Sequence, residues 1–285
     1  MLLHGIEDCL LLNLYCLFAF FMILSKNKFR CTNQISIRIE RNGLKMEVII
    51  KNNYEEISKL AADYLINTIK DKNDAILGLP TGSTPVGMYK EVINQYKDNI
   101  SFQSVRTFNL DEYVGLDKSN INSYRYFMNE NLFSHIDIKE ENIYIPNGAA
   151  IDMEQECINY EGLLKTTGQM DVMYLGIGQN GHIGFNEPGE FLEPFTHIVK
   201  LTEETIEANK RFFDNMESVP KTAITMGIKT IMSAKRIILL ASGESKAEAI
   251  LKTVKGKITP KVPASILQLH DDVTLIIDKD AAKYL

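Results

Sequence analysis

The chain has 285 residues, of which 45% are hydrophobic, and a formal net charge of −6. A chain of this size can bury one substantial core, and α/β folds of this length commonly form a single domain. The acidic balance argues against a nucleic-acid-binding protein, because such proteins normally present a basic patch or stripe. We therefore expect no nucleic-acid partner.

The first 45 residues differ in composition from the rest of the chain. Residues 9–24 are almost wholly apolar, and residues 26–45 are rich in Lys and Arg. A secretory signal peptide is disfavoured, because acidic residues precede the apolar run and no small-residue cleavage site follows it. As a membrane-spanning helix the run is short against the usual ~20 residues, and its basic C-terminal flank would keep the body in the cytoplasm.

A third interpretation is that Met46 is the true start of the protein, because a strand-like run begins there. We favour it, and so expect residues 1–45 to be an extension outside the domain. Residues 46–285 are then a single domain that is cytoplasmic, with no membrane partner. This domain contains one cysteine, Cys157, so neither a disulfide framework nor a cysteine-rich metal site is expected.

From Met46 onward, short β-rich runs alternate with helical ones. The pattern predicts strands at residues 46–51, 75–80, 105–110, 142–146, 171–178, 198–201, 236–241 and 273–278. It predicts helices at residues 54–72, 85–97, 123–136, 153–168, 202–213 and 246–254. This alternation indicates an α/β fold with a mostly parallel sheet and helices on both faces. Ligands of such folds bind beyond the carboxyl ends of the strands.

Residues 79–85, Leu-Pro-Thr-Gly-Ser-Thr-Pro, lie between a predicted strand and a predicted helix. Gly82 permits close backbone approach, and hydroxyls and the helix N-terminus supply donors, as in a phosphate-binding loop. An ordinary turn, with Thr84 as N-cap and Pro85 as the first helical residue, fits equally well. The loop lacks the Gly-Lys-Ser/Thr ending of a P-loop, so a nucleoside triphosphate is not indicated.

Residues 105–116 bring two adjacent carboxylates, Asp111 and Glu112, to the end of a predicted strand. One of them could act as a general base while the other is held by the protein. An acidic loop that caps a helix is the better-supported alternative when these residues are considered alone.

Residues 176–188 follow a predicted buried strand and are rich in glycine. His182 can move protons near neutral pH, and Glu187 can orient it. The glycine spacing matches a dinucleotide fingerprint, but no amphipathic helix follows, so a nicotinamide cofactor is not expected.

Two cations complete the pattern. Arg211 ends an amphipathic run, and Lys246 lies in the first turn of a predicted helix. A lysine there opposes the helix dipole and is better accommodated beside an anion such as phosphate, although a solvated surface lysine is a common alternative.

Four motifs together resemble the glucosamine-6-phosphate deaminase (glucosamine/galactosamine-6-phosphate isomerase) family: LPTGSTP, FNLDEYVGL, GIGQNGHIGFNEP and ANKRFFDN. The resemblance runs from Met46 to about Tyr284. It implies a modified doubly wound, Rossmann-like sheet and conversion of glucosamine 6-phosphate and water to fructose 6-phosphate and ammonia. It implies no metal or organic cofactor, and the protein would be a monomer or a homo-oligomer whose partner is its small-molecule substrate.

The resemblance also implies roles for individual residues. Asp111 matches the base that moves a proton from C2 to C1, and His182 matches the group that opens the sugar ring. Asn180 and Glu187 match the support of His182; because one branch of the family has aspartate at the position of Asn180, the supporting carboxylate here must come from Glu187. The matching phosphate-site residues are Thr81, Gly82, Ser83, Thr84, Arg211 and Lys246.

The segment after Pro188 lacks the paired basic residues of the allosterically regulated branch, so activation by N-acetylglucosamine 6-phosphate is not expected. Gly189 and Pro194 fit either a lid or an ordinary connection. Two rival functions remain open. A 6-phosphogluconolactonase would share the phosphate loop but needs no C2 proton transfer by Asp111. A sugar-phosphate sensor would be expected to carry a helix-turn-helix, which the N-terminal pattern does not indicate.

Overall fold

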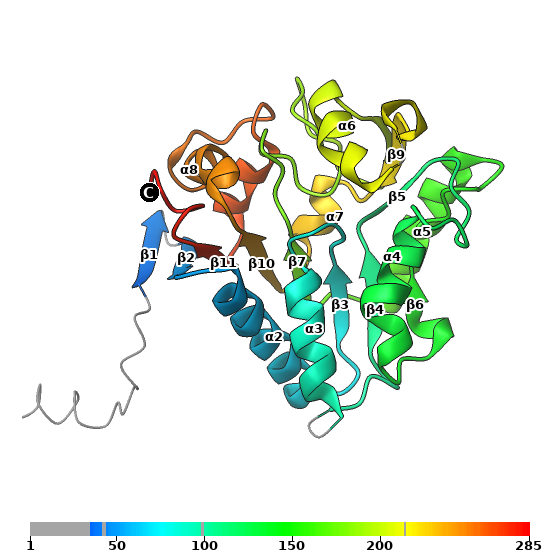
Figure 1. Ribbon diagram of the computed structural model, residues 1–285, viewed down its shortest axis with the longest axis horizontal. Helices are drawn as coiled ribbons and strands as arrows, with labels where there is room; N and C mark the ends of the chain where they lie inside the picture. The colour runs from blue at the N-terminus through cyan, green and yellow to red at the C-terminus, as the bar shows by residue number, and fades with distance from the viewer. Residues whose placement is uncertain (1–34, 42–43, 98–99, 214) are drawn as a thin grey trace, which may run out of the picture. The chain divides into compact units, whose positions relative to one another are not determined.

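The computed structural model describes residues 35–41, 44–97, 100–213 and 215–285, which belong to one compact unit. The unit is built on an eight-stranded sheet in the order β1-β2-β11-β10-β7-β3-β4-β6 (Figure 1). Neighbouring strands are parallel except for β1 and β2. The strands are β1 Ile35–Arg41, β2 Leu44–Lys51, β3 Ile76–Leu79, β4 Arg106–Asn109, β6 Ile143–Tyr144, β7 Val172–Leu175, β10 Arg236–Ala241 and β11 Asp272–Asp278.

Helices cover both faces of this sheet, as the alternation of strands and helices predicts. The α-helices are α2 Tyr54–Asp71, α3 Val86–Tyr96, α4 Tyr124–Asn131, α5 Met153–Thr167, α6 Glu203–Asn209, α7 Ile228–Met232 and α8 Ala247–Lys255. The 3₁₀ helices are η1 Phe133–His135, η2 Glu140–Asn142, η3 Lys210–Phe212, η4 Met216–Ser218, η5 Glu244–Lys246 and η6 Pro263–Leu269.

Successive residues of the central strands face opposite layers. In β10, Ile237 and Leu239 join the core that contains residues of α5, α7 and α8, whereas Ile238 and Leu240 join the core that contains residues of α2, α3 and α4. All four side chains are buried. Side chains alternate between the two faces of the strand, and both faces are buried. The strand is therefore a continuous apolar run in the sequence.

A smaller antiparallel sheet, in the order β5-β9-β8, lies beyond the carboxyl ends of the central strands β3, β4 and β7 (Figure 1). Its strands are β5 Asp111–Tyr113, β8 His197–Lys200 and β9 Thr222–Thr225. Because a single residue, Leu110, separates β4 from β5, the chain passes directly from the parallel sheet into the smaller one. The smaller sheet therefore brings Asp111 to the end of the sheet where ligands of α/β folds bind.

Residues 35–41 correct the expectation that the first 45 residues lie outside the domain. They form β1, which pairs with β2 from Ile35 opposite Ile50 to Arg41 opposite Leu44. The alternating sequence Ile-Ser-Ile-Arg-Ile-Glu-Arg is typical of a strand, but the basic composition of the region obscures it. The apolar run at residues 9–24 lies outside the described residues. Among the helices that the structure describes, none is both long and apolar enough to cross a bilayer.

Candidate active site

The loop after β3 is held in place by the hydroxyl of Tyr54. The Tyr54 hydroxyl donates to the carbonyls of Ser83 and Thr84, at 3.1 and 3.0 Å, and accepts from the backbone N–H of Gly87 at 2.8 Å. Gly82 has a φ of +87°, which favours glycine, and a side chain at this position would meet open space. The loop is thus fixed at the start of α3 while its tip at Gly82 stays uncovered.

The alternative in which Thr84 caps the helix is not what forms. Helix α3 begins at Val86, and Pro85 occupies the N-cap position without a side-chain hydrogen bond. The hydroxyl of Thr84 is therefore not used as the helix cap.

One cation, Arg211, contacts this loop, and a second, Lys246, lies near enough to Arg211 for their charges to interact. Arg211, in η3, donates from Nη2 to the Ser83 Oγ at 3.1 Å. Lys246 is the N-cap of α8; burial lowers the pKa of its ammonium group, and the charge of Arg211 lowers it further, with Glu204 opposing both. Two mutually repelling cations beside a hydroxyl-rich loop at the start of a helix are suited to bind a dianion such as phosphate.

Asp111 and Glu112 point in opposite directions because they are successive residues of strand β5. The Glu112 carboxylate accepts from the backbone N–H groups of Tyr113, Tyr124 and Arg125, at 2.9, 2.9 and 3.0 Å. It therefore caps the N-terminus of α4, together with Ser123. Glu112 is the carboxylate that the protein holds.

The Asp111 carboxylate faces the glycine-rich loop that follows β7. Its Oδ2 lies 3.5 Å from the position that a Cβ on Gly184 would take. No described residue donates a hydrogen bond or offers an ion pair to this carboxylate, and only 6% of the residue is exposed. Burial raises the pKa of Asp111 to about 8, with a smaller contribution from the charge of Glu112. A poorly solvated carboxyl group with such a pKa is suited to exchange protons near neutral pH.

Glycines make room for the His182 ring. A Cβ on Gly178 would lie 2.4 Å from Cε1 of the imidazole. Gly181 and Gly184 have φ values of +90° and +57°, in the left-handed region. Within residues 176–196, all of which the structure describes, the chain forms no helix, as expected.

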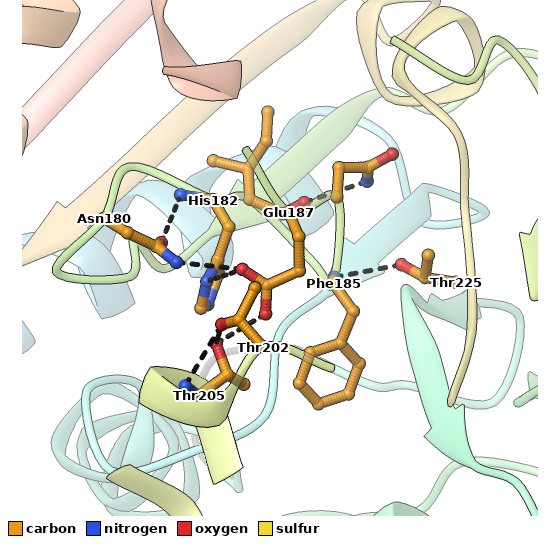
Figure 2. Close-up of polar contacts among 9 residues, drawn as sticks. Asn180, His182, Phe185, Glu187, Thr202, Thr205 and Thr225 are labelled. Carbon is orange, nitrogen blue, oxygen red and sulfur yellow. Dashed lines mark hydrogen bonds and ion pairs between the residues drawn. The ribbon is translucent and has the colours of Figure 1, made fainter. Parts of the chain in front are cut away.

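Figure 2 shows how the His182 side chain meets Glu187. The His182 Nδ1 lies 3.3 Å from Oε2 of Glu187, off the line of an ideal hydrogen bond. Asn180 donates from Nδ2 to the same Oε2 at 2.9 Å, and its Oδ1 accepts from the backbone N–H of His182 at 3.1 Å. The hydroxyl of Thr205, in α6, donates to the other oxygen, Oε1.

These contacts keep Glu187 ionised. Burial alone would raise the pKa of its carboxyl group, but the close contact with His182, together with hydrogen bonds from Thr205 and Asn180, holds the pKa below its usual value. An ionised carboxylate at Nδ1 favours a proton on that nitrogen, which leaves Nε2 as the nitrogen that can accept a proton from a ligand.

Comparison with known proteins finds matches that extend over most of the chain. The model of the glucosamine-6-phosphate isomerases/6-phosphogluconolactonase family matches residues 51–276. The chain belongs to this family. Two of its curated relatives are glucosamine-6-phosphate deaminases: one from Thermoanaerobacter sp. strain X514, 58% identical, and one from Clostridium novyi strain NT, 56% identical. Each match covers 84% of this chain, and 95% and 100% of the respective relative.

Solved structures of family members share the fold. A monomeric glucosamine-6-phosphate deaminase matches with a TM-score of 0.82 and 51% identity, over 84% of this chain and 99% of the other. A 6-phosphogluconolactonase from Trypanosoma cruzi matches with a TM-score of 0.68 and 19% identity, over 84% of this chain and 96% of the other. The second likeness concerns the fold alone.

The structure gathers the predicted site residues into two groups. Ser83 and Arg211 meet at the loop after β3, Lys246 interacts electrostatically with Arg211, and the Thr81 side chain of the loop interacts with the Tyr124 hydroxyl. The other group contains Asn180, His182 and Glu187, and Asp111 approaches the same glycine loop at Gly184.

Three further side chains at the candidate site are not indicated by the sequence pattern. Tyr124 lies with its hydroxyl 3.3 Å from that of Tyr113, Thr205 contacts Glu187, and the Thr225 Oγ1 accepts from the Phe185 N–H at 3.1 Å. Each comes from an element remote in sequence, so no local pattern indicates its partner.

Among the described residues, no group of three or more His, Cys, Asp or Glu is arranged to hold a metal ion.

Proposed function

We propose that the protein is a glucosamine-6-phosphate deaminase, which converts glucosamine 6-phosphate and water to fructose 6-phosphate and ammonia. The observation that carries the proposal is the combination of a buried carboxyl group, Asp111, with the His182–Glu187 pair at one glycine loop. Relatives that are 53–58% identical and bear this activity support it. Lactone hydrolysis needs no proton transfer at C2, so it would not require a carboxyl group with the raised pKa of Asp111.

His182 opens the sugar ring. Its imidazole accepts the proton of the C1 hydroxyl and returns a proton to the ring oxygen, so that the bond between C1 and that oxygen breaks and C1 becomes an aldehyde. Glu187 stabilises the transient imidazolium through Nδ1. Ring opening comes first because the hydrogen on C2 becomes acidic only beside a carbonyl.

Asp111 then moves the proton from C2 to C1. Its carboxylate removes the C2 hydrogen while the aldehyde oxygen gains a proton, which gives an enolamine with a C1–C2 double bond. Returning the proton to C1 gives an iminium ion at C2. Water adds to C2, ammonia leaves, and the ketone of fructose 6-phosphate remains. A buried carboxyl with a pKa of about 8 suits this step because it can both accept and donate a proton.

The phosphate is bound by the loop and the two cations. Ser83, Thr81 and Thr84 supply hydroxyls, Gly82 allows close backbone approach, and the side chains of Arg211 and Lys246 supply charge. The acid–base steps use side chains alone, so we propose that the reaction needs no metal or organic cofactor. A phosphorylated sugar does not cross membranes freely, and we propose a cytoplasmic location.

The full-length chain should release ammonia and fructose 6-phosphate in equal amounts from glucosamine 6-phosphate, measured by two independent coupled assays. Hydrolysis of 6-phosphogluconolactone without ammonia release would overturn the proposal in favour of a lactonase. Binding of sugar phosphates without turnover of either compound would favour a sensor.

A further inference from the structure

Thr205 contacts the supporting carboxylate of the site from a different element. It lies in the first turn of α6, is 4% exposed, and donates its hydroxyl proton to Oε1 of Glu187. The same hydroxyl accepts from Thr202 Oγ1 at 3.1 Å, and Thr202 is the N-cap of α6. Because Thr202 already supplies a proton to the Thr205 oxygen, the Thr205 proton is directed to Glu187 (Figure 2).

The two oxygens of Glu187 have different partners. Oε2 faces His182 Nδ1 and the Asn180 amide, whereas Oε1 is held by Thr205. A carboxylate held at only one oxygen can rotate about its terminal torsion, which has a broad energy well. The contact at Oε1 restricts this rotation and keeps Oε2 in front of the imidazole.

Helix α6 also leads to the phosphate site. It continues directly into η3, which carries Arg211, and Arg211 donates to Ser83 of the phosphate loop. One short helical segment, residues 203–212, therefore bears a contact to the supporting carboxylate at its start and a contact to the phosphate loop near its end.

We propose that Thr205 is a positioning residue for ring opening, whose hydroxyl holds Glu187 in the orientation that supports His182. This inference rests on the proposed deaminase function. Thr205 does not touch the reacting atoms. It acts through Glu187, and α6 joins it to the residues that bind the phosphate.

Electrostatics around Glu187 agree with this role. His182 is the titratable group whose charge acts on the Glu187 carboxylate within the described part of the chain, and the other two contacts, Asn180 and Thr205, are neutral donors. Losing the Thr205 donor leaves the effect of burial less opposed, so the pKa of Glu187 rises.

The test compares Thr205→Val, which keeps the shape and removes the hydroxyl, with Thr205→Ser, which keeps the hydroxyl. The valine variant should lower kcat for glucosamine 6-phosphate roughly tenfold with little change in KM, because a hydrogen bond to a charged group is lost. The serine variant should stay within about twofold of the parent chain.

A matched control is Thr230→Val. Thr230 is also buried, at 5% exposure, and its hydroxyl donates to a carboxylate oxygen of Glu161 at 2.8 Å, but this pair lies outside the site residues. Thr230→Val and Thr205→Val should lower the thermal midpoint of unfolding by similar amounts, because each removes one buried hydrogen bond, but Thr230→Val should leave kcat unchanged.

A double-mutant cycle separates positioning from a general structural effect. In a Glu187→Gln background, Thr205→Val should change kcat by less than about twofold, because the charged acceptor is already gone. An equal loss of kcat in the parent and in this background would overturn the inference.

A second measurement does not depend on turnover. The titration midpoint of the Glu187 carboxyl carbon, followed by NMR in the full-length protein, should rise in Thr205→Val and not in Thr205→Ser or Thr230→Val. An unchanged midpoint in Thr205→Val would also overturn the inference. Absence of fructose 6-phosphate from the parent chain would overturn the deaminase function instead, and this titration would still report on Thr205.

Discussion

Asp111 and Glu112 show how one peptide bond separates two different environments. Both carboxyl groups are buried, and burial raises the pKa of each. Three backbone N–H groups oppose that effect at Glu112, whereas no described donor opposes it at Asp111. The alternation of the strand thus leaves Asp111 as the carboxylate that can exchange a proton with substrate.

Replacing Asp111 by Asn should stabilise the protein more at high pH than at low pH. The folded-state pKa of about 8 exceeds the unfolded value, so the folded state binds the extra proton between about pH 4 and pH 8. The free energy of unfolding of the parent therefore falls as pH rises through this window. Urea unfolding should show a gain for Asp111→Asn of a few kcal/mol at pH 8.5 and little gain at pH 4.5. An equal gain at both pH values would contradict a raised pKa.

Individual site residues could be predicted from the sequence where a local pattern marks them. Gly82, His182 and Glu187 stand in unusual loops after apolar runs, and in the structure these loops follow the buried strands β3 and β7. The partnerships could not be predicted in the same way. Thr205 looks like any threonine in the first turn of a helix, and only the packing of α6 brings it to Glu187.

Helix α4 depends on the carboxylate of Glu112, which precedes it by a dozen residues. Glu112 accepts from two N–H groups in the first turn of this helix, and Tyr124 in that turn reaches the site. An acidic side chain at a helix N-terminus is favoured both by hydrogen bonding and by the helix dipole. The cap therefore positions the helix and the tyrosine together.

Glu112→Ala should lower the free energy of unfolding by roughly 2–4 kcal/mol, because three backbone donors lose their acceptor. Glu112→Gln keeps one oxygen acceptor and should cost about half as much. Denaturant unfolding measures both losses. Well below the unfolding midpoint, the glutamine variant should keep kcat within about tenfold of the parent, and a folded but inactive Glu112→Gln enzyme would point to Glu112 as the base.

Most central elements could be predicted because their patterns are long or fully apolar. The helix expected at residues 54–72 forms as α2, and the strand expected at residues 236–241 forms as β10. Strands β5 and β9 were not predicted, because each has at most four residues and β5 begins with two carboxylates. The strand expected at residues 198–201 forms as β8, but it pairs with β9 in the smaller antiparallel sheet rather than joining the parallel one. Local sequence does not show which strand it pairs with.

The candidate site and the β1 edge of the large sheet are separate. The candidate site follows β3, β4 and β7, whereas β1 is at the far end of the strand order. Strand β1 covers the free edge of β2, and an uncovered edge strand is prone to pairing with other chains. A chain that began at Met46, the boundary expected from the sequence, would leave this edge of β2 uncovered and would be less stable.

A variant that begins at Met46 should keep kcat for glucosamine 6-phosphate, because no site residue is removed. It should lose about 1–2 kcal/mol of stability, seen as a thermal midpoint lower by roughly 3–6 °C, and should self-associate more readily. Thermal unfolding, light scattering and a steady-state assay provide the three measurements. A folded variant without activity would show that the N-terminal region takes part in the site.

In the proposed mechanism, Asp111 moves the proton between C2 and C1 and makes no contact with the phosphate. The most direct measurement is kcat and substrate binding for Asp111→Asn beside the parent enzyme. We expect kcat to fall by about 10³-fold or more, because the base is lost, while the Kd for glucosamine 6-phosphate changes by less than about tenfold. An Asp111→Asn enzyme that releases fructose 6-phosphate at a rate close to that of the parent would contradict this mechanism.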